Sequence, residues 1–446
     1  MILFIDGRLL APSDQRHNPF EQSRRDLLKM ATEQRTQNDL RVDEKSNALA
    51  GITFGICVGG GIAALETPKL ARELRRLGAR VRFIATETAL EFVGRKALEW
   101  ASDNTVIIES SGLAQHIATD DAVLVFPATV DLIGKAAHGI CPDACSTYIQ
   151  SALGEQLPVF FLPTMHDSLR NSPAFKNNVS TLSAFASVSF ISPRVEEGKW
   201  KAPSTETLAL ELTYQFNRLR WQKTDSLSPV AIVTLGGTHS NIDVARTVTN
   251  RSTGTLGSLV TRSLLENGIA VKALCGNMSA KLDDCSGLER IVAAEFNDME
   301  TQLKKHCSDA KVSALFHLAA VSDYAVESSS TAKLSSSAPE LNLKLKRLPK
   351  LISMPEIAKV AYRVGCKFTS SNDEGGLTKA RALINDHKLN SVFWNWGESA
   401  FGSGSTQEGL ILHANGSQTV ATGKLNAAEL MVQNLVSYLK KAKSEK

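Results

Sequence analysis

The sequence lacks the features that would place it in a specialised class of protein. No run of about 18 consecutive apolar residues occurs, so no transmembrane helix is predicted. Asp6 and Arg8 interrupt the apolar start too early for a signal peptide. The formal net charge is only +4 at pH 7, without the strongly basic character typical of a nucleic-acid binder. We therefore expect a cytoplasmic protein with neither a membrane nor a nucleic acid as its partner.

Cysteine is scarce and scattered. The chain has 7 cysteines, an odd number, and only Cys141 and Cys145 lie close together. No second pair or histidine at zinc-ligand spacing accompanies them. The prediction is a set of reduced thiols, with no disulfide framework and no metal site built by the protein.

The remaining composition is that of an ordinary globular protein, with 43% hydrophobic and 22% charged residues. A length of 446 residues predicts two or three domains, at roughly 150 residues each. Residues 1–50 are polar after Leu10 and are predicted to form a peripheral extension with one short helix at residues 24–32. The whole positive excess lies in residues 224–446, where a solvated face and a basic tail are the plain interpretation.

Alternating apolar runs and helix-length segments begin at residue 51. An apolar run at residues 52–58, a glycine triplet, a helical stretch at 63–77 and a second run at 80–85 make a βαβ unit. A polar linker is expected at residues 222–228, after which the pattern restarts. The sequence therefore predicts an α/β protein with two consecutive Rossmann-like, doubly wound domains, at residues 51–221 and 229–446. Further strands are predicted at 122–126, 159–162, 188–191, 230–235, 270–274, 314–319 and 391–394, a helix at 257–267, and a mobile loop at 328–337.

The glycine triplet at residues 59–61 is a candidate phosphate site. Glycines let a backbone approach a phosphate closely, and a helix N-terminus favours an anion. The triplet alone fits an ordinary tight turn equally well. Thr129, just after a predicted strand, would lie at the carboxyl edge where open α/β sheets bind ligands. His116 taken alone fits a surface or capping residue.

Several motifs together give a more specific indication. They are residues 60–64 (GGIAA), 86–92 (TETALEF), 116–117 (HI), 127–129 (PAT), 135–143, 163–165 (PTM) and 171–173 (NSP). In this order and spacing the first half resembles the FMN-dependent cysteine decarboxylase flavoproteins over roughly residues 51–205. That family includes phosphopantothenoylcysteine decarboxylase. The resemblance implies an FMN that oxidises the substrate's thiol so that CO2 can leave, with His116 as the active-site histidine. By the same match the FMN site would comprise Gly60, Gly61, Ile62, Thr88, Phe92, Pro127, Ala128 and Thr129.

Three positions depart from this resemblance. His166 stands where the family has an asparagine that holds the substrate carboxylate, and Asp131 stands where another asparagine is expected. The lid segment, residues 193–200, is short, and no cysteine occurs between Cys145 and Cys275. Whether decarboxylation is intact, or the first domain is a vestigial assembly module, is left open by the sequence.

The second half repeats the arrangement of strand, glycine turn and polar loop. Residues 236–238 (GGT), 249–254 (TNRSTG) and 319–323 (AAVSD) carry small, hydroxyl and amide residues that suit a phosphate, although ordinary loops have the same composition. With Lys333 and Phe368, these motifs resemble the phosphopantothenate–cysteine ligases over about residues 229–440. Many bacteria fuse that ligase behind the flavoprotein domain in this order.

The second resemblance implies that CTP, or ATP in some branches, activates 4'-phosphopantothenate with Mg2+ before cysteine displaces the nucleotide. Asn250 would hold the acyl-nucleotide intermediate, and Lys333 would offset phosphate charge. Two lysine-rich segments of the family are depleted here, because Ser335 and Ser336 follow Lys333 and His387 ends the segment 383–387. The nucleotide and substrate residues implied by the match are Gly237, Ala319, Asp323, Lys333 and Phe368, with His166 in the first domain.

Together the two resemblances predict a bifunctional, multifunctional enzyme of coenzyme A biosynthesis. Two alternatives remain: a ligase with a vestigial flavin domain, and a non-catalytic flavin-binding regulatory or scaffold protein. The expected partners are small molecules (4'-phosphopantothenate, cysteine and a nucleoside triphosphate) and further copies of the chain in a homo-oligomer.

Overall fold

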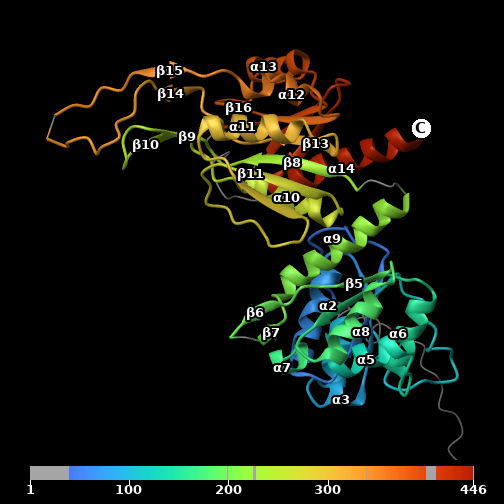
Figure 1. Cartoon of the computed structure of the whole chain (residues 1–446). Helices are drawn as coiled ribbons and strands as arrows, with labels where there is room; N and C mark the ends of the chain where they lie inside the picture. Colours follow the sequence, from blue (N-terminus) through green and yellow to red (C-terminus); the bar gives the residue numbers. More distant parts are fainter. Residues whose placement is uncertain (1–39, 198, 225–227, 338, 398–407, 445–446) are drawn as a thin grey trace, which may run out of the picture.

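The computed structural model describes residues 40–197, 199–224, 228–337, 339–397 and 408–444. It has two α/β bodies, joined by the long helix α9 (Thr205–Thr224) (Figure 1). Most of the predicted extension, with the helix expected at residues 24–32, lies outside the described residues.

The first body is built on a five-stranded parallel sheet in the order β2-β1-β3-β4-β5. All seven residues of β3 are buried, as expected for a parallel strand covered on both faces. Alternate residues of β1 face opposite sides, because Phe54 and Ile56 join one apolar cluster and Cys57 joins the other. The strands are β1 (Thr53–Val58), β2 (Arg80–Ala85), β3 (Ala122–Ala128), β4 (Val159–Pro163) and β5 (Val188–Phe190).

Helices cover both faces of this sheet. The face of Phe54 is covered by α2 (Thr67–Arg76), α4 (Arg95–Ser102) and α9. The face of Cys57 is covered by α5 (Val130–His138), α6 (Ala144–Gly154) and α8 (Pro173–Ser183). This is the doubly wound arrangement that the sequence predicted. Three short elements complete the body: η1 (Ile62–Glu66), α3 (Glu87–Leu90) and α7 (Asp167–Arg170).

The second body has an eight-stranded sheet in the order β12-β11-β8-β13-β16-β17-β18-β19. The first six strands are parallel, and the last two are antiparallel. The Rossmann-like prediction is confirmed, and the antiparallel edge is an addition to it. The strands are β8 (Val230–Leu235), β11 (Ala270–Cys275), β12 (Leu288–Val292), β13 (Val312–His317), β16 (Tyr362–Thr369), β17 (Ser391–Trp396), β18 (Glu408–His413) and β19 (Gln418–Thr422).

Helices also lie on both faces of the second sheet. One face packs against α10 (Thr255–Glu266) and α14 (Gly423–Ser444). The other packs against α11 (Phe296–Cys307), η2 (Leu351–Ser353), α12 (Pro355–Ala358) and α13 (Glu374–His387). None of the helices within the described parts of the chain is long and apolar enough to cross a membrane.

Three small hairpins project from these bodies. The predicted lid segment forms β6 (Arg194–Glu196) and β7 (Lys199–Lys201). In the second body, β9 (His239–Asn241) pairs with β10 (Thr247–Thr249), and β14 (Tyr324–Val326) pairs with β15 (Leu345–Arg347). Figure 1 shows the last two extending away from the second body as arms. Residues 328–337 contain neither helix nor strand, in agreement with the predicted loop.

Two segments near the predicted boundaries belong to the folded bodies or to the helix between them. Residues 222–224 of the expected linker are the last residues of α9, and residues 225–227 lie outside the described part. At the end of the predicted extension, Leu49 is fully buried in the first core, and its N–H donates to the carbonyl of Leu77 at 2.8 Å. The packed first body thus includes residues before position 51. The exact domain bounds stay a prediction.

Candidate functional sites at two sheet edges

Each sheet has one place where the chain reverses the direction in which it adds strands. In the first sheet it lies between β1 and β3, and in the second between β8 and β13. Open parallel sheets bind ligands at the carboxyl ends of the strands flanking such a switch point. The glycine turns after β1 and β8 occupy these two places, so the local sequence and the topology indicate the same two sites.

The glycine turn of the first site is pressed against its neighbours. A Cβ on Gly60 would lie 2.7 Å from Thr88 Oγ1, and one on Gly59 would lie 2.5 Å from the carbonyl oxygen of Pro127. Only glycine fits such approaches without a shift of the backbone. Gly60, Thr88 and Pro127, which were predicted to bind FMN, are therefore brought together.

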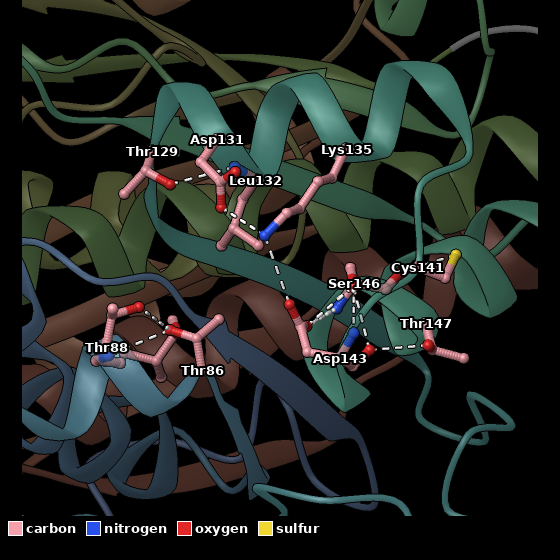
Figure 2. A network of polar contacts seen from close by, with 12 residues as sticks. Thr86, Thr88, Thr129, Asp131, Leu132, Lys135, Cys141, Asp143, Ser146 and Thr147 are labelled. Carbon is pink, nitrogen blue, oxygen red and sulfur yellow. Dashed lines mark hydrogen bonds and ion pairs between the residues drawn. The ribbon is translucent and has the colours of Figure 1, made fainter.

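Two threonines cap the helices beside this turn (Figure 2). Thr86 Oγ1 accepts a hydrogen bond from the N–H of Ala89 and lies 3.2 Å from Thr88 Oγ1. Thr129 Oγ1 accepts from the N–H of Leu132 at 3.2 Å and caps α5. The amide groups and the positive end of the α5 dipole are thus next to the glycine turn, an arrangement that fits the phosphate group of a flavin nucleotide.

The acidic side chain of Asp131 is neutralised inside the same helix. Lys135 Nζ lies 2.7 Å from Asp131 Oδ2 and 3.6 Å from Asp143 Oδ2 (Figure 2). The hydrogen bond to Asp131 raises the pKa of Lys135. Because this ammonium group offsets its charge, Asp131 does not present an unbalanced anion to a phosphate at the start of α5.

A cavity of about 690 Å³ opens beside the glycine turn and is walled by the β6–β7 hairpin. The N–H of Trp200 donates to the carbonyl of Met165 at 3.1 Å, and Lys199 forms an isolated β-bridge with His166. The guanidinium of Arg170 stacks 5.0 Å from the ring of Trp200. The predicted lid is therefore docked on the segment that carries His166, and both line the cavity.

His166 is held by the helix that follows it. Its Nδ1 accepts a hydrogen bond from the N–H of Ser168 at 3.4 Å, as the cap of α7. In the neutral ring the proton then resides on Nε2. His166 thus presents an N–H donor at a cavity wall where an amide was expected.

Three further predicted residues of the first site do not line the cavity beside the glycine turn. His116 is exposed in an irregular segment before β3 and does not line the cavity beside the glycine turn. Phe92 is 39% exposed at the surface after α3. Ala128 is fully buried within β3, so it shapes the strand end without opening onto the cavity.

The second site consists of two adjoining cavities. One has a volume of about 350 Å³ and lies over the start of α10, and the other has about 690 Å³ and lies over the ends of β13 and β16. Because they share a wall, two ligands could meet there. The shared residues are Arg251, Ala320, Cys366 and Phe368.

Asn250 is fixed next to this shared wall, in the lining of the larger cavity. Its Nδ2 donates to the carbonyls of Ala320 and Val321, both at 3.2 Å. A Cβ on Gly237 would lie 2.9 Å from the carbonyl of Asn250, so the glycine allows this close packing. The predicted residues Gly237, Asn250 and Ala319 therefore lie at one sheet edge, and the last two line the larger cavity.

Asp323 and Lys333 have different positions. Asp323 lines the larger cavity and forms an ion pair with Lys350. Lys333 is exposed on the arm between β14 and β15, outside the linings of both cavities. The arm is attached to the β9–β10 turn, where Asp243 Oδ2 accepts from the N–H of Leu334 at 3.1 Å.

Several cavity residues were not identified from the sequence as ligand-binding. His317 ends β13 and lines the larger cavity, and Lys424 at the start of α14 lines the smaller one. Burial lowers the pKa of Lys424. The position of His317 as the last residue of a central strand was the available signal. In the described part of the chain no group of three or more histidine, cysteine or acidic residues is arranged as a metal site.

These features define the class of the protein: a flavoprotein-type α/β domain followed by a second α/β domain with a two-chambered site. The flavoprotein family model matches residues 42–216, and the model of the DNA/pantothenate metabolism flavoprotein C-terminal domain matches residues 228–439. The chain belongs to the family of coenzyme A biosynthesis bifunctional proteins CoaBC, as its relatives show.

One such relative, from Thermococcus kodakarensis, is 32% identical over 82% of this chain and 90% of its own length. Another, from Methanocaldococcus jannaschii, is 32% identical over 79% of this chain and 85% of its own. The solved DNA/pantothenate metabolism flavoprotein of Streptococcus pneumoniae is 24% identical, with a TM-score of 0.43, over 47% of this chain and 100% of its own.

Proposed function

We propose that the chain catalyses two successive steps of coenzyme A biosynthesis. The second domain joins cysteine to 4'-phosphopantothenate with CTP or ATP and Mg2+, and the first domain decarboxylates the phosphopantothenoylcysteine with FMN. The observation that carries the proposal is the pair of adjoining cavities, with Asn250 in the lining of the larger one and hydrogen-bonded to Ala320 of their shared wall. It is supported by bifunctional relatives that this chain matches over 90% and 85% of their length.

The smaller cavity of the second domain suits 4'-phosphopantothenate. The N-termini of α10 and α14 lie at its wall together with Arg251 and Lys424. Amide groups at helix starts and two cationic side chains favour a phosphate. The substrate's carboxylate would then extend toward the shared wall at Phe368.

The larger cavity suits the nucleoside triphosphate. In the first half-reaction, the substrate carboxylate attacks the α-phosphorus and pyrophosphate leaves. In the second, the amine of cysteine attacks the acyl carbon and the nucleoside monophosphate leaves. Asn250 has its amide fixed by two backbone carbonyls, so its Oδ1 has a set direction toward the intermediate. Lys333, on the arm, would offset charge on the phosphates.

The first domain offers a fitting site for FMN. Gly60 and Thr88 are packed so closely that no side chain fits between them, and Thr129 starts a helix beside them. Gly61, Ile62, Phe92, Pro127 and Ala128 complete the proposed cofactor site. FMN, when bound, supplies the two-electron oxidation of the substrate thiol that allows CO2 to leave.

His166 is proposed to orient the substrate's carboxylate. Its Nδ1 accepts from the N–H of Ser168, which leaves Nε2 to donate at the cavity wall. His116 is exposed, and we propose that it acts on the flavin site of another subunit in a homo-oligomer.

The test is to incubate the purified full-length chain with 4'-phosphopantothenate, isotopically labelled cysteine and CTP or ATP, and to follow the products by mass. The expected products are phosphopantothenoylcysteine and then phosphopantetheine with labelled CO2. Asn250→Ala should abolish the first product, whereas Asn177→Ala, on the exposed side of α8, should not. Absence of both products from wild-type protein would refute the proposal.

A second candidate is a ligase whose first domain is not catalytic. It is favoured by His166 at the expected asparagine position and by the absence of cysteine from the β6–β7 hairpin. In that case phosphopantothenoylcysteine should be the last product detected by mass. Added phosphopantothenoylcysteine should release no CO2.

A further inference from the structure

The larger cavity of the second domain has a histidine at the end of a central strand. His317 is the last residue of β13, between β8 and β16. It lines the cavity with Asn250 and Asp323. Burial lowers the pKa of His317 to about 4, so the imidazole is neutral near pH 7. This neutral ring differs from the cationic side chains of Arg251, Lys350 and Lys367 in the same lining.

The hydrogen bonds of Thr234 decide which nitrogen of His317 carries the proton. Thr234 is fully buried, and its Oγ1 accepts from the N–H groups of Leu318 and Ala319, both at 3.1 Å. A hydroxyl has two acceptor positions and one proton. With both acceptor positions used, Thr234 must donate its proton to His317 Nδ1, 3.0 Å away. Nδ1 is therefore an acceptor, and the ring proton resides on Nε2.

The Nε2–H group has no hydrogen-bond partner among the described residues. The lining of this cavity is mixed: Ala319, Val321 and Ile352 are small or apolar, and Arg251, Lys350 and Lys367 are cationic. A neutral imidazole offers a phosphate one donor and no positive charge. Lys350 and Lys367 of the same lining supply the charge that phosphates need. The neutral donor of His317 and the apolar residues of the lining instead suit a flat heteroaromatic ring with an acceptor atom.

We propose that His317 is a specificity-determining residue that donates a hydrogen bond from Nε2 to an acceptor atom of the nucleobase. The inference rests on the proposed binding of a nucleoside triphosphate in this cavity. A donor that is left unsatisfied by the wrong base discriminates strongly, because a buried polar group without a partner is costly. The ring would thus contribute to the choice of base and not to holding the triphosphate.

The experiment measures dissociation constants of the full-length chain for CTP, UTP, ATP and GTP by calorimetry, with inorganic tripolyphosphate as a probe that has no base. His317→Leu should raise the dissociation constant of the preferred nucleotide by about tenfold or more, which is the effect of one lost hydrogen bond with a buried partner. The differences in dissociation constant among the four nucleotides should become smaller as a result. His317→Gln, which keeps an N–H donor, should retain most of the discrimination. Tripolyphosphate should bind wild type and His317→Leu equally.

The outcomes separate this inference from the proposed function. If wild type binds no nucleotide, the proposed function of the second domain fails. Two outcomes with nucleotide-binding wild type overturn only the role of His317. In one, His317→Leu keeps the same preference among the four nucleotides. In the other, His317→Leu weakens the binding of tripolyphosphate as much as that of the preferred nucleotide. Nitrogen-15 spectra of the imidazole give a readout independent of binding. They should show a protonated Nε2 and an unprotonated Nδ1, and the reverse assignment would contradict the argument.

Discussion

At the scale of single residues, the two sites use close packing and hydrogen-bond saturation to fix polar groups. In the first, glycines without side chains let the turn after β1 touch Thr88 and Pro127. In the second, Thr234 uses its one proton and both acceptor positions, and so sets the direction of the His317 ring. In the second site a residue that does not line the cavity thus determines what its neighbour can offer.

The packing at Gly60 predicts a large effect of one methyl group. Gly60→Ala places a Cβ 2.7 Å from Thr88 Cβ and Oγ1, so the turn must shift. We expect FMN to dissociate more readily, by at least tenfold in Kd, measured by flavin fluorescence. Adding Thr88→Gly should restore part of the affinity. Gly154→Ala is the control, because nothing lies within 4 Å of its Cβ position and it ends α6. Equal affinities for Gly60→Ala and wild type would contradict this packing argument.

The half-buried His317 predicts a definite dependence of stability on pH. Its pKa is about 4 in the folded chain, below the ordinary value of 6.5. Between these values the unfolded chain binds more protons at this histidine than the folded chain does. The contribution of His317 to stability is therefore fully present above about pH 6.5 and is lost as pH falls toward 4. The loss from one such group is at most about 1.4 kcal/mol per pH unit.

Urea unfolding of wild type and His317→Gln at several pH values would measure this contribution. All other titrating groups, including the half-buried His413, are common to both proteins and cancel in the difference. The stability advantage of wild type should shrink as pH falls from 6.5 to 4. A difference that stays constant across this range would show that His317 does not titrate as argued.

At the scale of elements, α9 is the structure that connects the two bodies. Leu208, Leu212 and Phe216 belong to the first core, whereas Leu210 and Tyr214 belong to the second. Glu211 accepts from both the N–H and the hydroxyl of Ser286. The helix begins directly after the β6–β7 hairpin, so one wall of the first cavity is continuous with the interface between the domains.

Asn217 of α9 is predicted to hold this interface. Its Nδ2 donates to the carbonyl of Ala48 at 3.1 Å and to that of Glu266 at 2.7 Å, one in each body. Because the side chain is buried, Asn217→Ala leaves both carbonyls unsatisfied and should cost about 1–3 kcal/mol in urea unfolding. Gln222→Ala, an exposed amide on the same helix, should change stability by less than about 0.5 kcal/mol. Similar losses for both variants would argue against a specific role of Asn217.

At the scale of the whole molecule, the parallel cores could be predicted from sequence because buried parallel strands are continuous apolar runs. β2 and β8 match their predicted ranges, 80–85 and 230–235, and both glycine turns lie at the switch points. β16 was missed, because Lys367 and Gly365 interrupt its apolar pattern. The antiparallel edge and the hairpins were also not predicted, because short, half-exposed strands have no distinct periodicity.

The sites were predictable only where a residue follows a strand in a recognisable motif. Asn250 and Asp323 were identified in this way, and both line the larger cavity. His317 was missed because the hydrogen bonds that define its role come from Thr234, 83 positions away in the sequence. Such long-range contacts carry no local signal.

The division of α9 between two cores predicts opposite responses of neighbouring leucines when the domains are separated. In a fragment of residues 205–446, Leu210 keeps its packing in the second core, whereas Leu208 loses the first core that buries it. Leu210→Gln should therefore destabilise the fragment by about 2 kcal/mol or more, the value of a buried leucine side chain. Leu208→Gln should leave the stability of the fragment unchanged, or should make the fragment more soluble.

In the full-length chain, both substitutions should be destabilising, because both leucines are at most 1% exposed there. Thermal unfolding of the four proteins, with the two wild-type backgrounds as references, provides the measurement. If Leu210→Gln were as harmless as Leu208→Gln in the fragment, α9 would belong to the first domain alone. The boundary between the domains would then lie after the helix.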